Sequence, residues 1–265
     1  MAQFHWKVAG VSVVGFSHVA EEIPCQDAHA VTVLPGGWLI AIVADGAGSA
    51  IRSAEGSRNV CDGVLAHLNS RLAEFSSKPD QIDERTIRSW IEEAIELVRN
   101  KFVSLAGANG NSISDFHATL VGAVAGPNGG VFFHVGDGAA CASSLNNLSK
   151  NILSLPENGE YANETYFVTQ DEWRDHLRTL SFDSNYNLVA LMSDGVTPFA
   201  LTQGASGPSP PFFEPVSRFL VEHDRDESER ALTTLLGRDA IRRVTGDDKT
   251  LILALRTEPD GQLLS

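Results

Sequence analysis

The stretch WLIAIVADGAGSA, residues 38–50, is a continuous apolar run that stops at Asp45 and Gly46. A run so rich in apolar and β-branched residues predicts a β-strand over residues 38–44. Residues 28–34 have the same character, and Pro35-Gly36-Gly37 between the two runs predicts a turn. The two segments therefore predict adjacent strands of an antiparallel sheet, the second of which ends in a glycine-rich loop.

Helical spacing replaces the strand pattern after this loop. Apolar residues recur at three- and four-residue intervals from Ser49 to Ser77 and again from about Glu84 to Leu105. Asp83 stands where an N-cap of the second helix is expected. We predict that these two helices pack as a pair against a sheet.

Further strands are predicted on both sides of the helix pair, at residues 8–16, 117–126, 131–136, 139–144, 187–193 and 250–256. Residues 127–130 predict a hairpin loop and residues 136–138 a tight turn. Helical patterns occupy residues 170–180 and 213–244, residues 201–212 read as a surface loop, and the tail after Arg256 is expected to fray.

Because strands and helices rarely alternate, we expect an α+β fold with two sheets and helices outside them. A single domain of residues 1–265, with its core at about 8–256, is expected from the chain length.

The charge composition limits the partners of the chain. It has 34 acidic residues against 20 Lys and Arg, a formal charge of −14, which repels nucleic acid and anionic membranes. No apolar run reaches the roughly 18 residues of a membrane helix, and the N-terminus lacks the pattern of a signal peptide. Three cysteines do not make a disulfide framework. We therefore expect a cytoplasmic protein.

Aspartates recur where apolar strands begin or end, at Asp45, Asp137, Asp194 and the pair Asp247-Asp248. Any one of them could be ordinary turn chemistry, because Asp-Gly is common in tight turns. Four such positions together favour a cluster at one rim of the sheets, where like-charge repulsion calls for divalent cations. Oxygen ligands favour Mg²⁺ or Mn²⁺, and no HExxH or Cys/His spacing indicates zinc.

Six short motifs in a fixed order resemble the metal-dependent PPM (PP2C-type) serine/threonine protein phosphatases, bacterial type, over about residues 10–255. They are CQDA (25–28), VADGAGSA (43–50), HATLVGAV (117–124), HVGDGAA (134–140), LMSDG (191–195) and GDDKTLIL (246–253). The resemblance implies a four-layer α-β-β-α sandwich of two antiparallel sheets flanked by helices. It also implies a centre of two Mn²⁺ or Mg²⁺ ions at one end of the sandwich.

The resemblance also implies a role for individual positions. Asp45 corresponds to the carboxylate that bridges both ions and Gly46 to a carbonyl ligand, while Asp194 and Asp247 complete the first ion's ligands. Asp27 corresponds to an acidic residue near the centre, and we predict it as a further residue of the metal site. Asp137 corresponds to a residue that helps to hold a third, weaker ion in some bacterial members, and Thr119 to a structural threonine behind the site.

Three positions depart from the family pattern. The family's phosphate-binding arginine is replaced by Glu22, so His18 and Arg52 are the candidates for that contact. Gln26 replaces an acidic residue, and Asp248 stands where the family has asparagine. We expect these departures to affect the binding of the substrate phosphate more than the binding of metal.

The activity implied is hydrolysis of phosphoserine and phosphothreonine by a metal-activated water, with Asp45, Asp194 and Asp247 as catalytic residues. The implied partners are a phosphorylated protein and a cognate Ser/Thr kinase. Cysteine-dependent phosphatase chemistry is excluded, because Val31, His67 and Asn147 stand six residues after the cysteines where arginine is needed. Two alternatives are a pseudophosphatase that serves as a binding module and a phosphatase of a small phosphorylated metabolite.

Overall fold

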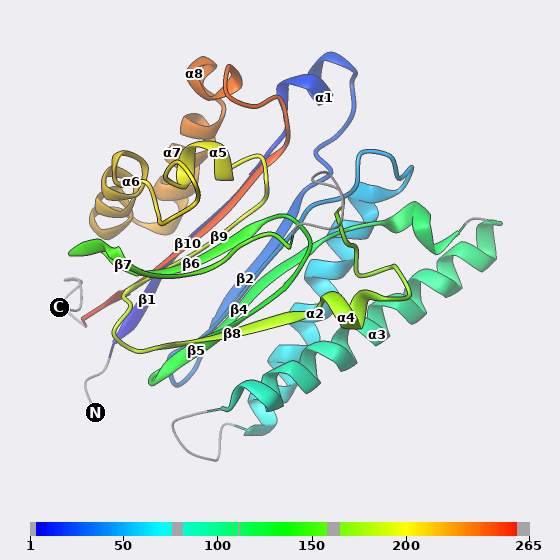
Figure 1. The fold of residues 1–265 in the computed structure, drawn as a ribbon, viewed down its shortest axis with the longest axis horizontal. Helices are drawn as coiled ribbons and strands as arrows, with labels where there is room; N and C mark the ends of the chain where they lie inside the picture. Colours follow the sequence, from blue (N-terminus) through cyan, green and yellow to red (C-terminus); the bar gives the residue numbers. More distant parts are fainter. Residues whose placement is uncertain (1–3, 76–81, 111, 158–164, 259–265) are drawn as a thin grey trace.

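Two five-stranded antiparallel sheets form the centre of the molecule, and helices cover the outer face of each (Figure 1). The structure is a computed structural model and describes residues 4–75, 82–110, 112–157 and 165–258. The first sheet consists, in spatial order, of β1 (His5–Val13), β10 (Lys249–Thr257), β9 (Leu188–Met192), β6 (Ala139–Ser144) and β7 (Asn147–Ser154). The second consists of β2 (Ala28–Leu34), β3 (Trp38–Ala44), β4 (Leu120–Gly126), β5 (Gly129–Val135) and β8 (Arg178–Asp183).

Two helix layers enclose the sheets. The outer face of the second sheet packs on α2 (Ser53–Phe75) and α3 (Glu84–Asn109), and the outer face of the first on α6 (Pro210–Glu222) and α7 (Arg225–Leu236). The shorter helices are α1 (Phe16–Ala20), η1 (Ile113–Phe116), α4 (Trp173–His176), α5 (Thr197–Ala200) and α8 (Asp239–Arg242). No helix in the described ranges is both long and apolar enough to cross a membrane.

Three apolar cores separate these four layers. In β3, Ile40 and Ile42 face α2 and α3, whereas Leu39, Ala41 and Val43 face the other sheet. A third core lies between the first sheet and α6 and α7. Because the central strands are covered on both faces, their sequences are continuous apolar runs rather than alternating ones. The predicted four-layer α-β-β-α sandwich is confirmed.

Two predicted turns are present as hairpins. Leu34 pairs with Trp38 across the turn between β2 and β3, where Gly36 and Gly37 have φ angles of 85° and 80°. Gly126 pairs with Gly129 across the turn between β4 and β5. The bend at 136–138 has a different role, since it carries the chain from β5 in one sheet to β6 in the other.

Several predicted boundaries were wrong. Residues 170–180 hold only the single turn α4 before β8 begins, and β7 has no counterpart among the predicted strands. The first strand ends at Val13 rather than residue 16, and α1 follows it. The helical stretch 213–244 is divided into α6, α7 and α8, and α6 starts inside the predicted surface loop.

The predicted cap is correct, because the Asp83 side chain accepts a hydrogen bond from the Thr86 amide. The predicted frayed tail lies mostly outside the described residues.

Candidate active site

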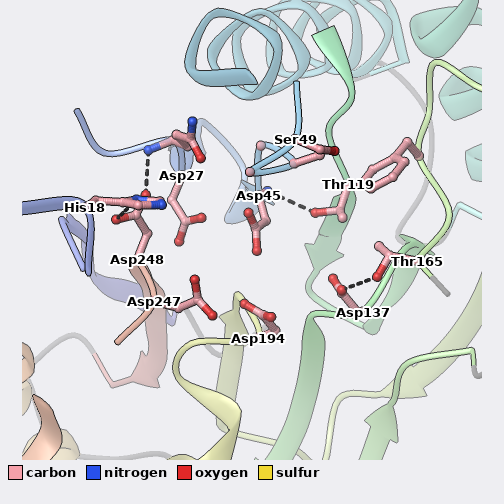
Figure 2. Close-up of a pocket in the computed structure, with 15 residues that line it drawn as sticks. His18, Asp27, Asp45, Ser49, Thr119, Asp137, Thr165, Asp194, Asp247 and Asp248 are labelled. Atoms are coloured by element: carbon pink, nitrogen blue, oxygen red, sulfur yellow. Dashed lines mark hydrogen bonds and ion pairs between the residues drawn. The ribbon is translucent and has the colours of Figure 1, made fainter. Parts of the chain in front are cut away.

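The aspartates from the strand ends meet at one cavity of about 330 Å³. Antiparallel pairing brings them together, because the end of one strand lies beside the start of its neighbour. Asp27 precedes β2 and Asp45 follows β3, while Asp194 follows β9 and Asp247 precedes β10. Asp137 joins them from the bend between the two sheets. Figure 2 shows the carboxylates of Asp27, Asp45, Asp194 and Asp247 facing a shared space.

Asp45 is fixed from behind by Thr119. The Asp45 amide donates to Thr119 Oγ1 over 2.9 Å, and the Thr119 amide donates to the Asp45 carbonyl over 2.8 Å. Burial raises the pKa of Asp45 well above its usual range, and the charges of Asp27 and Asp194 raise it further. This arrangement fits the structural role expected of Thr119.

Asp27 is buried, and one of its two carboxylate oxygens has a partner. Ser193 Oγ donates to Asp27 Oδ2 over 2.7 Å, whereas Oδ1 has no hydrogen-bond partner among the described residues. The pKa of Asp27 is raised to about 7, because the effect of burial exceeds that of the hydrogen bond from Ser193, which lowers it. A buried oxygen without a partner destabilises the folded state unless a further ligand, such as a cation, binds to it.

Asp137 and Asp194 repeat this pattern on the other side of the cavity. Thr165 Oγ1 donates to Asp137 Oδ2 over 2.6 Å, and Asp137 Oδ1 is buried without a described partner. Burial raises the pKa of Asp194 to about 6, with a further rise from the charge of Asp137. The neighbouring carboxyl of Asp194 in turn contributes to the raised pKa of Asp45.

The donor set fits divalent cations by its chemistry. It offers unsatisfied carboxylate oxygens whose charged form is disfavoured until a cation is present, and such oxygens suit Mg²⁺ or Mn²⁺. Gly46 also lines the cavity, and the packing requires glycine there, because a Cβ would lie 2.6 Å from the Ser53 carbonyl oxygen and 2.7 Å from that of Gln26. Within the described residues, however, no three His, Cys, Asp or Glu side chains already form a group that could hold an ion. Mg²⁺ keeps several water ligands and is bound through one or two carboxylates, so a preformed group of three is not required.

The two candidate phosphate ligands lie in different places. His18, on α1, lines the cavity, and its Nδ1 lies 3.0 Å from Asp248 Oδ1. Arg52 is not among the lining residues: its Nη2 lies 2.6 Å from Glu55 Oε2, and its guanidinium lies 4.3 Å from the centre of the Phe116 ring. The structure thus brings His18, but not Arg52, to the aspartates.

Other lining residues had no site role in the sequence analysis. They are Gln26, Ala47, Gly48, Ser49, Thr165, Phe167 and Asp248. Gln26 was visible in the sequence only as a departure from the family pattern, and Asp248 as such a departure and as the second member of the aspartate pair before the last strand. Thr165 and Phe167 belong to no recognisable motif, so no signal in the sequence pointed to them.

The match to a protein-family model and the similarity to known proteins agree with this geometry. The model described as protein phosphatase 2C matches residues 14–237. Serine/threonine-protein phosphatase 3 of Escherichia coli (strain K12) is 28% identical over 264 residues, which cover 96% of this chain and 99% of that protein.

Solved structures share the fold at low sequence identity. A bacterial serine phosphatase superposes with a TM-score of 0.63 at 16% identity, covering 95% of this chain and 98% of that one. Stp1 from Staphylococcus aureus gives 0.60 at 16% identity, over 96% and 95% of the two chains. RsbX in complex with magnesium gives 0.55 at 16% identity, over 97% and 100%. With the family model matched over most of its length, the chain belongs to the protein phosphatase 2C family.

Proposed function

We propose that this protein phosphatase hydrolyses phosphoserine and phosphothreonine in proteins at the cavity between the strand ends. The observation that carries the proposal is the convergence of Asp27, Asp45, Asp137, Asp194 and Asp247 on one cavity, with orphaned oxygens on Asp27 and Asp137. The curated relative is named a serine/threonine-protein phosphatase, which supports the same class of substrate.

Six groups would hold the metal. Asp45 and the Gly46 carbonyl would bind two Mn²⁺ or Mg²⁺ ions together with Asp194 and Asp247, and Asp137 would help Asp194 with a third, weaker ion. The ions, when bound, supply Lewis-acid activation of a water molecule and neutralise the phosphate charge. Asp27, held by Ser193, would be the sixth ligand, and Thr165 fixes the orientation of Asp137.

Binding of the substrate phosphate is assigned to His18. It is a potential cation at the cavity, whereas the Arg52 guanidinium is paired with Glu55. A ring nitrogen of His18 can donate a hydrogen bond to a phosphate oxygen while the carboxylates remain available for cations. The hydrolysis itself needs no nucleophile from the protein chain.

The setting of the activity is also inferred. A phosphorylated protein is the substrate class, and a cognate Ser/Thr kinase would supply it. The three free cysteines support a reducing, cytoplasmic compartment, and we retain a single domain of residues 1–265 with its core at about 8–256.

The test is metal-dependent turnover of a phosphothreonine peptide, compared with a phosphotyrosine peptide and a panel of phosphorylated metabolites. Asp45→Asn and Asp194→Asn should each abolish Mn²⁺-dependent hydrolysis of p-nitrophenyl phosphate, with an unchanged circular dichroism spectrum. Activity of both variants in EDTA would refute the metal mechanism. Folded wild-type protein that binds phosphopeptide without turnover would indicate a pseudophosphatase, and preference for a metabolite would replace the protein substrate.

A further inference from the structure

Asp248 is a buried carboxylate that lines the cavity. Two backbone amides donate hydrogen bonds to it, and His18 makes an ion-pair contact with it that lacks hydrogen-bond geometry. The Gly15 amide donates to Asp248 Oδ1 over 2.6 Å, and the Gln26 amide donates to Oδ2 over 2.6 Å. His18 Nδ1 lies 3.0 Å from Oδ1. The residue is 4% exposed, so these groups take the place of water around its charge.

These contacts join segments that are more than 200 residues apart in sequence. Gly15 immediately precedes α1, which carries His18, and Gln26 immediately precedes Asp27. The Gln26 carbonyl in turn accepts the amide of Gly46 over 3.2 Å. One carboxylate therefore links the helix that carries the proposed phosphate ligand to the loop that carries part of the proposed metal site.

The contact with Asp248 also decides which nitrogen of His18 is free. Two lone pairs repel each other at 3.0 Å, so the close approach of Nδ1 to Oδ1 places a hydrogen between the two atoms. Nε2 is then the nitrogen left for a ligand, and His18 lines the cavity. A histidine held through one nitrogen presents the other in a fixed direction.

We propose that Asp248 is a positioning residue that orients His18 for the substrate phosphate. The inference rests on the proposed role of His18 and adds what holds that ring. Asparagine, the residue expected here from the family pattern, could not do the same: it has one acceptor oxygen and would turn its NH₂ group toward one of the incoming donors. The departure at this position thus accompanies the exchange of the family arginine for a histidine.

Ser17 provides a matched control on the same helix. Its amide and its Oγ both donate to the Gly246 carbonyl, over 3.2 Å and 2.6 Å, without involving Asp248. Ser17→Ala therefore loosens the attachment of α1 and leaves the carboxylate contacts in place. A purely structural role of Asp248 would make the two variants behave alike.

The experiment measures kcat and KM on a phosphothreonine peptide, and inhibition by inorganic phosphate, at saturating Mn²⁺ determined for each variant. We expect Asp248→Asn and His18→Ala each to raise KM and the phosphate inhibition constant about tenfold, the loss of one charge-assisted hydrogen bond, while kcat changes little. The double variant should be no weaker than the single ones, because both remove the same contact. Ser17→Ala should lower the melting temperature and leave KM within about twofold of wild type.

A second pair of variants tests the orientation without changing Asp248, in case Asp248→Asn does not fold. The amide nitrogen of Gln reaches the position of Nε2, and that of Asn the position of Nδ1. We expect His18→Gln to bind phosphate more tightly than His18→Asn, because only Gln has a donor at the Nε2 position. It should still bind more weakly than wild type, because it lacks the contact with Asp248. The reverse order would overturn the inference.

Two other results would overturn it: multiplicative effects in the double variant, or an Asp248→Asn defect that consists only of a higher Mn²⁺ requirement. An unchanged KM in His18→Ala would instead refute the proposed phosphate ligand itself. A wild-type protein without phosphatase activity would refute the proposed function. These failures are therefore distinguishable.

Discussion

His134 is a residue whose protonation state is set by the fold. It lies in β5, completely buried, with Nδ1 3.0 Å from Ser154 Oγ and Nε2 without a described partner. Burial lowers its pKa from 6.5 to about 3, and the positive charge of Arg178 lowers it further. The imidazole is therefore neutral in the folded protein at physiological pH.

This neutral histidine should make the protein sensitive to acid. The folded-state pKa is depressed, so stability is present above pH 6.5 and is lost as the pH falls toward 3, because only the unfolded chain takes up the proton. At pH 5 the loss should be about 2 kcal/mol. Urea unfolding at pH 7.5 and pH 5 in EDTA should show that His134→Asn, which can keep a contact to Ser154 but does not titrate, loses about 2 kcal/mol less than wild type between the two pH values. Parallel losses would contradict the prediction.

At the scale of residues, the sequence was informative where a motif coincides with a strand end. Asp45, Asp194 and Asp247 stand beside apolar runs, so their meeting at one rim could be predicted. Asp248 could not be assigned a role, because its partner Gly15 is 233 positions away and only the folded chain brings the two together. Arg52 was predicted near the phosphate by its position in sequence, but Glu55 one helical turn away pairs with it.

Among the secondary-structure elements, the contact between α2 and η1 leaves no room for a side chain at Gly56. A Cβ there would lie 2.4 Å from the Phe116 carbonyl oxygen, and η1 leads into Thr119, which supports Asp45. Gly107 in α3 is the opposite case, because a Cβ at that position would meet nothing within 4 Å. The two helical glycines thus differ only in their surroundings.

Alanine at these two glycines should have effects of opposite sign. Gly107→Ala should stabilise the protein by up to about 1 kcal/mol, the difference in helix propensity. Gly56→Ala gains the same propensity but forces α2 and η1 apart, and overpacking of this kind costs about 1–3 kcal/mol. Its net effect should be destabilising. Urea unfolding of both variants tests this, and a stabilised Gly56→Ala protein would refute the close contact.

The elements missed by the sequence analysis are explained by their place in the sheets. β7 and β8 each form one edge of their sheet, and both expose several side chains, whereas β1 and β2 at the opposite edges expose one side chain each. An edge strand with one solvated face lacks the continuous apolar run that identified β3, β4, β9 and β10, which are covered on both faces. The central strands were therefore predictable, whereas β8 was mistaken for part of a helix.

For the whole molecule, the order of motifs predicted the sandwich, since paired strands bring their adjoining loops to one end. What could not be predicted is how a protein with a formal charge of −14 limits the repulsion among the carboxylates of the cavity. In the structure two of these carboxyls have raised pKa values, about 7 for Asp27 and about 6 for Asp194, and burial is the first cause of both. Without cations, the ionised cavity opposes folding.

This opposition predicts how stability depends on pH and metal. A carboxyl whose folded-state pKa is raised contributes stability below its unfolded pKa near 4, and that stability is lost as the pH rises through 6 to 7. In EDTA, Asp194→Asn should therefore melt at a higher temperature than wild type at pH 8, and the difference should shrink at pH 5. The exposed Asp175, replaced by Asn, removes the same charge away from the cavity and should show neither effect.

Manganese should stabilise the folded protein at the pH values where the carboxylates alone destabilise it, because it binds their ionised form. At a concentration 100 times the dissociation constant, a single bound ion stabilises the native state by about 2.7 kcal/mol. Protons compete for the same oxygens, so the Mn²⁺-induced rise in melting temperature should be larger at pH 8 than at pH 5.5. It should be reduced in Asp194→Asn and unchanged in Asp175→Asn. A rise that is equal at both pH values, or equal in Asp194→Asn and wild type, would mean that manganese binds somewhere other than among these aspartates.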